Sequence, residues 1–430
     1  MSELVAFGFL IVLLTLIFIR VEVAFALAFV SVGWLVYGDY PLHIVASQAF
    51  TGMDQFVLVA IPFFLLLGEL MNNSRITDRL IRVANVTVGR IRGGLAQANV
   101  ATSFLFAGIS GAAVADVAAL GSIFVPAMSD EGYPRDFSAA VTAASSLIGP
   151  IIPPSIILVV YGGVTQTSIG GLFAAAIVPG ILLAIAMMTL VFAMSFRRDF
   201  PRFEEEIELK EYPVILGDSV LALTMPVLIL VLILGGYSTP TEAAAVACAY
   251  AFVIGVFIYG TLDANGLYRS LHVSLKRSAQ LYVIIGFALV LTWILARERI
   301  PQAASEMLIG LGVGPVGYML IVVVMLLLIG TFLEIGAATI MLAPTLAELA
   351  IVFGIDPLQF GLVLVLALCY GLITPPVGIC LFAASSVSQT PVWDIAKQIV
   401  PFFVTNLCVL VLIVLFPELT LYLPEQFGFV

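Results

Sequence analysis

Long apolar runs recur from one end of the chain to the other, and they constrain the fold more than any other feature. They are about 20 residues long, the length that an α-helix needs to cross the hydrocarbon core of a bilayer. Of the 430 residues, 62% are hydrophobic and only 10% are charged. We therefore predict an all-α polytopic membrane protein. Residues 4–19 are expected to be a first span, since they lack the charged n-region and cleavage site of a signal peptide.

One apolar run is interrupted by prolines near its middle. Residues 145–155 read Ser-Ser-Leu-Ile-Gly-Pro-Ile-Ile-Pro-Pro-Ser. Proline lacks an N–H and crowds the carbonyl four residues earlier, so we expect the carbonyls of Ser146, Gly149 and Pro150 to lack helical donors. Such a break survives in a bilayer only inside protein or beside a water-filled cavity, and transporters use such breaks to hold ions and substrate. We predict that this stretch forms half of a binding site.

A second interruption reads Gly371-Leu-Ile-Thr-Pro-Pro-Val-Gly378. The same geometry predicts free carbonyls at Gly371 and Leu372. Pro376 follows Pro154 at an offset of 222 residues. One Pro-Pro pair could be an ordinary helix kink, but two at matching places favour the paired sites of an internal repeat.

Other landmarks recur in the same order in both halves. Glu22, Asp116 and Pro126 of the first half correspond to Glu242, Glu334 and Pro344 of the second. Each half is expected to contain about five spanning helices plus one re-entrant hairpin, with one helix of each half broken. An odd number of crossings would invert the second half in the membrane. The expected hairpins are 95–129 and 313–348, the broken helices are 137–162 and 358–384, and the other spans are 21–37, 55–72, 171–195, 214–235, 242–260, 278–296 and 398–416.

Positive charge gathers in residues 73–94, which include Arg75, Arg79, Arg82, Arg90 and Arg92. The positive-inside rule places this loop in the cytoplasm. It either lies along the interface as an amphipathic helix or is a plain basic loop. The linker 197–213 is also placed in the cytoplasm. The net charge of −10 comes partly from its acidic residues, which are most simply a solvated face.

Two acidic residues lie within the expected hairpins. Asp116 and Glu334 are costly in an apolar segment, so each either binds ion or substrate or caps a half-helix. Glu242 follows Thr239-Pro-Thr241, which favours a capping role. Arg297 lies just before the second hairpin and is a candidate for binding a carboxylate, with snorkelling at the interface as its alternative.

Hydroxyl groups lie beside both breaks. Ser103, Ser110, Ser145 and Thr374 can supply oxygen ligands to a cation, although serine and threonine in apolar helices often bond back to their own backbone. Ser155 follows the first Pro-Pro pair and joins Asp116, Glu334 and Arg297 as a candidate substrate contact.

Enzymatic functions find little support in the sequence. His43 and His272 are the only histidines, which leaves little from which to build a zinc site or a Ser-His-Asp triad. The four cysteines have no metal-ligand or disulfide spacing, and no Walker-type loop or nucleic-acid-binding basic face is present. An intramembrane protease would need paired acids such as Asp116 and Glu334, but two re-entrant breaks suit ions better than a peptide.

Together these motifs resemble the large membrane subunit of tripartite ATP-independent periplasmic (TRAP) transporters. The resemblance is carried by Ile61-Pro-Phe-Phe-Leu-Leu-Leu-Gly-Glu-Leu-Met71, by the stretch 108–126 (GISGAAVADVAALGSIFVP) and by 143–155 (AASSLIGPIIPPS). It covers essentially the whole chain. At Ala112 many family members carry a second serine, so no ligand is expected there.

The resemblance implies a secondary transporter of the bacterial inner membrane, driven by Na⁺ and without an organic cofactor. It implies two partners, a small four-helix membrane subunit and a periplasmic substrate-binding protein. Two Na⁺ sites are implied, one at Ser110, Ser145 and the carbonyls around Gly149 and Pro150, the other at Gly330, Gly371 and Thr374. Substrate, most often a carboxylate in this family, would lie near Asp116.

An elevator mechanism is also implied, in which a transport domain moves against a scaffold. The transport domain would comprise 95–170 and 313–390. The scaffold would comprise 1–94, the linker-containing segment 171–312 and the C-terminal segment 391–430. The alternative is a stand-alone Na⁺- or H⁺-coupled carboxylate carrier with the same hairpin plan.

Overall fold

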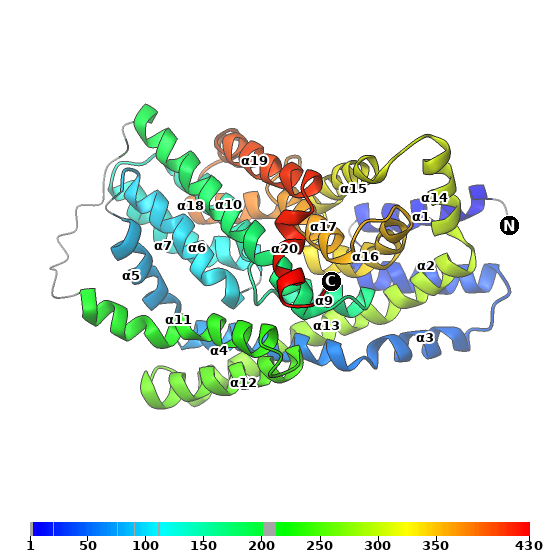
Figure 1. The fold of residues 1–430 in the computed structure, drawn as a ribbon, viewed down its shortest axis with the longest axis horizontal. Helices are drawn as coiled ribbons and strands as arrows, with labels where there is room; N and C mark the ends of the chain where they lie inside the picture. The colour runs from blue at the N-terminus through cyan, green and yellow to red at the C-terminus, as the bar shows by residue number, and fades with distance from the viewer. Residues whose placement is uncertain are drawn as a thin grey trace.

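The computed structural model describes residues 3–19, 21–74, 76–89, 91–110, 112–198, 200 and 212–430, and all regular secondary structure in them is helical. The elements are shown in Figure 1. In the first part of the chain they are α1 (Glu3–Phe18), α2 (Val23–Tyr37), α3 (His43–Met53), η1 (Phe56–Val59), α4 (Ala60–Asn73), α5 (Ile76–Val88), α6 (Gly94–Ser110), α7 (Ala113–Asp130), α8 (Arg135–Ser145), η2 (Ser146–Ile148), α9 (Ile156–Thr165) and α10 (Ile169–Arg198). In the second part they are α11 (Tyr212–Leu234), α12 (Pro240–Val253), η3 (Ile254–Ile258), α13 (Ala264–Arg297), α14 (Ile300–Gly310), α15 (Pro315–Gly330), α16 (Ile335–Val352), α17 (Pro357–Gly371), α18 (Ile379–Ser388), α19 (Val392–Leu415) and α20 (Glu418–Gln426).

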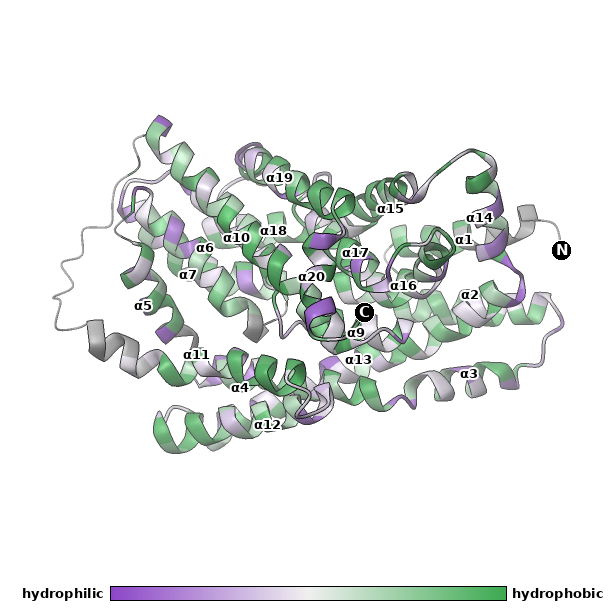
Figure 2. Ribbon diagram, viewed as in Figure 1, coloured by the Kyte–Doolittle hydropathy of each residue, from purple (hydrophilic) through white to green (hydrophobic). Residues whose placement is uncertain are grey.

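The helices have the length and apolar character of membrane spans. Within the described residues, seven are long and apolar enough to cross a bilayer, or eight if α14 and α15, which meet at a bend of 119°, are counted as one span. Figure 2 shows hydrophobic residues, in green, along most of the helices. The prediction of a polytopic helical membrane protein is therefore confirmed. The inverted relation of the two halves stays a prediction.

Both expected hairpins are present as pairs of consecutive helices, α6–α7 and α15–α16. The length of 95–129 predicts two legs of roughly 15 residues, each too short to cross a bilayer alone. α7 and α16 each have 18 residues and satisfy the length and composition criteria for a span, so this expectation is wrong for α7. Whether the hairpins are re-entrant stays a prediction.

The hairpins and the broken helices interlock across the two halves. α18 of the second broken helix packs against α7 and α8, while α9 of the first packs against α16 and α17. In Figure 1 the α6–α7 and α15–α16 hairpins lie toward opposite ends of the molecule, with α9 and α17 between them. Each break is therefore held by elements from both halves of the chain.

A second group of helices lies along one side of this unit. α13 packs against α2, α3 and α4, and α12 packs against α4. α13 begins earlier than expected, because the Asp263 carboxylate accepts from the Gly266 N–H at 2.7 Å and caps a start well before residue 278. α12 starts with a capping box between Thr239 and Glu242. This confirms the capping role of Glu242.

Candidate ion and substrate site

The first broken helix is interrupted where its prolines predicted. α8 ends at Ser145, a 3₁₀ turn follows, and α9 begins at Ile156. Ser155 caps α9 by accepting from the Leu158 N–H at 3.2 Å, and its hydroxyl also donates to the Pro150 carbonyl. Ser155 is fully buried, and its hydroxyl links the Pro150 carbonyl of the break to the first turn of α9.

Only one of the three carbonyls expected to be free is free in the described part of the chain. The Ser146 carbonyl accepts from the Gly149 N–H at 3.2 Å, because the chain tightens into a 3₁₀ turn that moves each donor one residue earlier. The Pro150 carbonyl accepts the Ser155 hydroxyl. The predictions for Ser146 and Pro150 are therefore wrong. No described donor reaches the Gly149 carbonyl, as predicted.

Asp116 lies directly against this break. It is 1% exposed and belongs to the first turn of α7, where the helix dipole favours a negative charge. A Cβ atom at Gly149 would lie 2.4 Å from the Asp116 carboxylate oxygen Oδ2. The acid and the glycine, which the sequence only placed in the same region, are therefore in contact.

Buried polar side chains join α6 to α8 beside the break. The Ser103 hydroxyl donates to Ser145 Oγ at 2.8 Å, and the Asn99 amide donates to Thr142 Oγ1 at 2.6 Å. All four side chains are buried. Asn99 was not among the candidates from the sequence, although an amide in an apolar helix is a signal of a buried polar contact. The side chain of Ser110 lies outside the described residues.

The second broken helix stops at Gly371 and resumes at Ile379. The Gly371 carbonyl accepts from the Thr374 N–H at 2.9 Å, and the Leu372 carbonyl accepts from the Cys380 N–H at 3.0 Å. The predicted free carbonyls at Gly371 and Leu372 are therefore wrong, because the turn and the start of α18 supply donors. No described donor reaches the carbonyls from Ile373 to Val377, and those of Ile373 and Thr374 lie nearest the end of α17.

The tip of the second hairpin meets this break. The Gly378 N–H donates to the Thr331 carbonyl at 3.1 Å. Gly330 and Gly371 lie in backbone contact, since a Cβ at Gly371 would come within 2.6 Å of the Gly330 Cα. Thr374 Oγ1 donates to the Tyr370 carbonyl at 2.7 Å, which leaves the two lone pairs of that hydroxyl for a cation.

Glu334 caps α16 by accepting from the Ala337 N–H at 3.0 Å. The capping alternative for this residue is confirmed.

A small polar pocket opens beside Asp116. It has a volume of about 90 Å³ and lies between α4, α6, α7, α9 and α13. Its polar lining residues are Glu69, Asn72, Asp116 and Arg277. Arg297 is 20 residues further along the same helix as Arg277, or about 30 Å at 1.5 Å per residue. The structure therefore does not bring Arg297 to this pocket.

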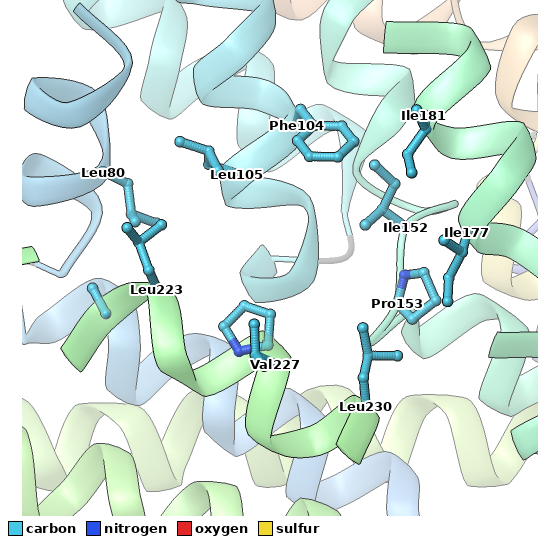
Figure 3. A pocket seen from close by; sticks show the side chains of 12 residues that line it. Leu80, Phe104, Leu105, Ile152, Pro153, Ile177, Ile181, Leu223, Val227 and Leu230 are labelled. Carbon is cyan, nitrogen blue, oxygen red and sulfur yellow. The ribbon is translucent and has the colours of Figure 1, made fainter. Parts of the chain in front are cut away.

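A larger pocket of about 310 Å³ lies between α5, α6, α10 and α11. Figure 3 shows apolar side chains from these elements and from the first break pointing into it, including Phe104, Ile152 and Val227. No described lining residue is polar or charged. A hydrophilic solute would lose its hydrogen bonds there, so the smaller pocket is the better candidate for a polar substrate.

Comparison with protein families agrees with this architecture. Residues 10–419 match the family described as tripartite ATP-independent periplasmic transporter, DctM component. The chain belongs to the DctM family of TRAP transporters. DctM proteins are transport permeases, not enzymes.

The DctM relatives are named for different solutes. The chain is 37% identical to the sialic acid TRAP transporter large permease SiaM of Vibrio cholerae, over 96% of this chain and 97% of that protein. It is 36% identical to the C4-dicarboxylate large permease DctM of Pseudomonas aeruginosa, over 92% of each. It is also 36% identical to the isethionate permease DctMQ of Oleidesulfovibrio alaskensis, over 97% of this chain and 66% of that longer protein.

Two solved transporter structures share the fold of this DctM chain. They are the YdaH transporter of Alcanivorax borkumensis (TM-score 0.61, 15% identity, 86% of each chain) and MtrF of Neisseria gonorrhoeae (TM-score 0.62, 14% identity, 88% of this chain and 85% of that one).

Proposed function

We propose that this DctM chain is the large permease subunit of a Na⁺-driven TRAP transporter that imports a small organic anion across the bacterial inner membrane. Family membership supports two partners, a small membrane subunit and a periplasmic protein that delivers the substrate. The relatives' solutes support an anion, since sialic acid and C4-dicarboxylates are carboxylates and isethionate is a sulfonate.

The observation that carries the proposal is the set of free carbonyls at the two breaks. At the first, the Gly149 carbonyl lies near Asp116, with the Ser103 and Ser145 hydroxyls close by on α6 and α8. At the second, the Ile373 and Thr374 carbonyls lie near the Thr374 hydroxyl. Unwound backbone carbonyls of this kind coordinate Na⁺ in transporters. These residues fit one cation at each break.

The interlocking of the hairpins and broken helices supports an elevator mechanism. Contacts between α7 and α18 and between α9 and α16 join both candidate sites into one body. This body would move against the group that contains α2, α4, α12 and α13. Rigid-body movement of one bundle of helices against another is a common form of alternating access, and here the candidate sites would move with the body.

The proposal is tested by reconstituting the chain with a small membrane subunit and a periplasmic binding protein of the same transporter, and by measuring uptake against Na⁺ concentration. Thr374→Ala should raise the half-activating Na⁺ concentration roughly 10-fold, equivalent to about 1.4 kcal/mol. Thr405→Ala is a matched control. Thr405 lies on α19, and its Oγ1 donates to the carbonyl four residues earlier, that of Pro401, at 2.9 Å, as Thr374 Oγ1 does to Tyr370. Equal Na⁺ curves for both variants and the wild type would exclude Thr374 as a ligand.

The same experiment separates a TRAP permease from a stand-alone carrier. A TRAP permease requires both partner proteins for uptake. Uptake by the large chain alone would support the stand-alone carrier.

A further inference from the structure

The polar pocket beside Asp116 contains one basic side chain among its described lining residues, Arg277 of α13. Arg277 Nη1 donates to Glu69 Oε1 of α4 at 2.8 Å. The arginine side chain is 48% exposed, whereas the glutamate side chain is 15% exposed. The guanidinium is therefore accessible from solvent, while a carboxylate from the protein itself occupies one of its donors.

The ion pair is not needed to join α4 to α13. The two helices pack closely against each other. One turn away, Asn73 Nδ2 donates to the buried Ser270 Oγ at 2.9 Å and provides a second polar link between them. The pair is open to water on the arginine side, where the guanidinium stays solvated when the pair separates, whereas the Glu69 carboxylate is 15% exposed and loses its partner in a largely buried place. The free-energy cost of separating the pair therefore lies mainly at Glu69, and an incoming anion must offset it by a stronger contact with Arg277.

The geometry of the pair suits an exchange of carboxylates. A guanidinium has five donors in a planar fork and binds carboxylate or phosphate groups through two of them at once. Only Nη1 contacts Glu69 within hydrogen-bond distance. An incoming anion that engages two donors would form a stronger contact than the one it displaces.

We propose that Arg277 recognises the anionic group of the transported solute, and that Glu69 occupies this position until a carboxylate or sulfonate displaces it. This inference rests on the proposed transport function and assigns the substrate class of that same site. Asn72 lies in the same pocket and can donate to the bound anion. Asp116 lines the same pocket from α7, and a carboxylate there would repel a bound anion toward Arg277.

Exchange and a simple structural ion pair predict different effects of mutating the two partners. If Glu69 competes with substrate, Glu69→Gln removes the competing charge and lowers the KM for uptake several-fold. Arg277→Gln removes the recognition group and raises the KM about 10- to 100-fold, with a smaller change in kcat. Arg277→Lys keeps the charge but not the planar fork, so its KM should lie between those of the wild type and Arg277→Gln. If the ion pair were only structural, Glu69→Gln and Arg277→Gln would change the KM in the same direction.

Uptake would be measured in proteoliposomes that contain the chain and both partner proteins, with succinate, N-acetylneuraminate and isethionate as probes. Ser270→Ala is the control, because it removes the neighbouring α4–α13 link outside the pocket. Opposite shifts in KM for Glu69→Gln and Arg277→Gln, with Ser270→Ala unchanged, support the proposal. A KM for Arg277→Gln equal to that of the wild type, or raised KM values for both variants, overturns it while leaving the transport function intact.

A second readout does not depend on transport. Thermal unfolding of the purified chain is followed with each of the three anions and with choline as a cationic control. The proposal expects an anion to raise the melting temperature of the wild type and of Ser270→Ala, but not of Arg277→Gln. Absence of any anion effect on the wild type overturns it. Absence of uptake together with a shift that requires Arg277 would refute the transport function and leave the anion site in place.

Discussion

At the first break, the absence of a side chain decides where a carboxylate can lie. Gly149 has ordinary right-handed helical angles, so its backbone alone would accept alanine. The constraint comes from Asp116, whose carboxylate occupies the volume in which a Cβ would lie. A glycine within a break is usually explained by conformational freedom, but here it is explained by the close approach of a buried acid.

Gly149→Ala should therefore displace the Asp116 carboxylate. We expect the free energy of unfolding to fall by about 1–3 kcal/mol, as in other cases of overpacking. Na⁺ should also activate uptake more weakly. In an Asp116→Ala background the same substitution should cost little, since the volume is then empty. Thermal unfolding of the two single variants and the double variant measures this coupling. Additive effects would show that the acid and the glycine do not interact.

At the scale of elements, one helix crossing sets the geometry of the second break. α15 and α17 pack against each other, and their backbones touch at Gly330 and Gly371. Backbone, unlike a side chain, cannot change rotamer to admit another atom. The position of the second hairpin tip on the break therefore depends on both glycines.

Gly371→Ala should separate α15 from α17 and destabilise the chain by about 3 kcal/mol, the upper end of the usual range for overpacking. Gly310→Ala on α14 is the control, because no atom lies within 4 Å of its added Cβ; its effect should stay within about 0.5 kcal/mol. Melting temperatures of the purified variants provide the test. Equal stability of both variants would mean that the crossing can relax.

At the scale of the whole molecule, the interface between α11 and the interlocked unit is incompletely filled. The apolar pocket of about 310 Å³ separates α11 from α6, α10 and the first break. In an elevator, this interface would have to slide. Loose apolar packing lowers the cost of sliding, because few specific contacts are exchanged.

Ala222→Phe should fill part of this pocket and stabilise the chain by about 0.5–2 kcal/mol, as cavity-filling substitutions often do. We expect slower uptake at an unchanged half-activating Na⁺ concentration, since the ion sites lie elsewhere. Val246→Phe serves as the control, because Val246 is an exposed residue of α12 that does not line the pocket. Uptake by Ala222→Phe at the wild-type rate would contradict a moving interface at α11.

Much of this protein was determined by its sequence alone. The apolar runs required a helical membrane protein, and the two Pro-Pro pairs required breaks, because a missing N–H acts on the carbonyls of its own segment. The motifs around Asp116 and Pro154 were sufficient to indicate the family.

Only the tertiary structure decided which atoms remain free at those breaks. Local turns and caps supplied donors to Ser146, Pro150, Gly371 and Leu372 and left the carbonyls of Gly149, Ile373 and Thr374 without described donors. The pocket that joins Arg277 to Asp116 was likewise invisible in the sequence. The physical reason is that hydrogen-bond satisfaction and side-chain contact depend on the spatial neighbours of a residue, whereas the loss of helical bonding at a proline depends only on the adjacent chain.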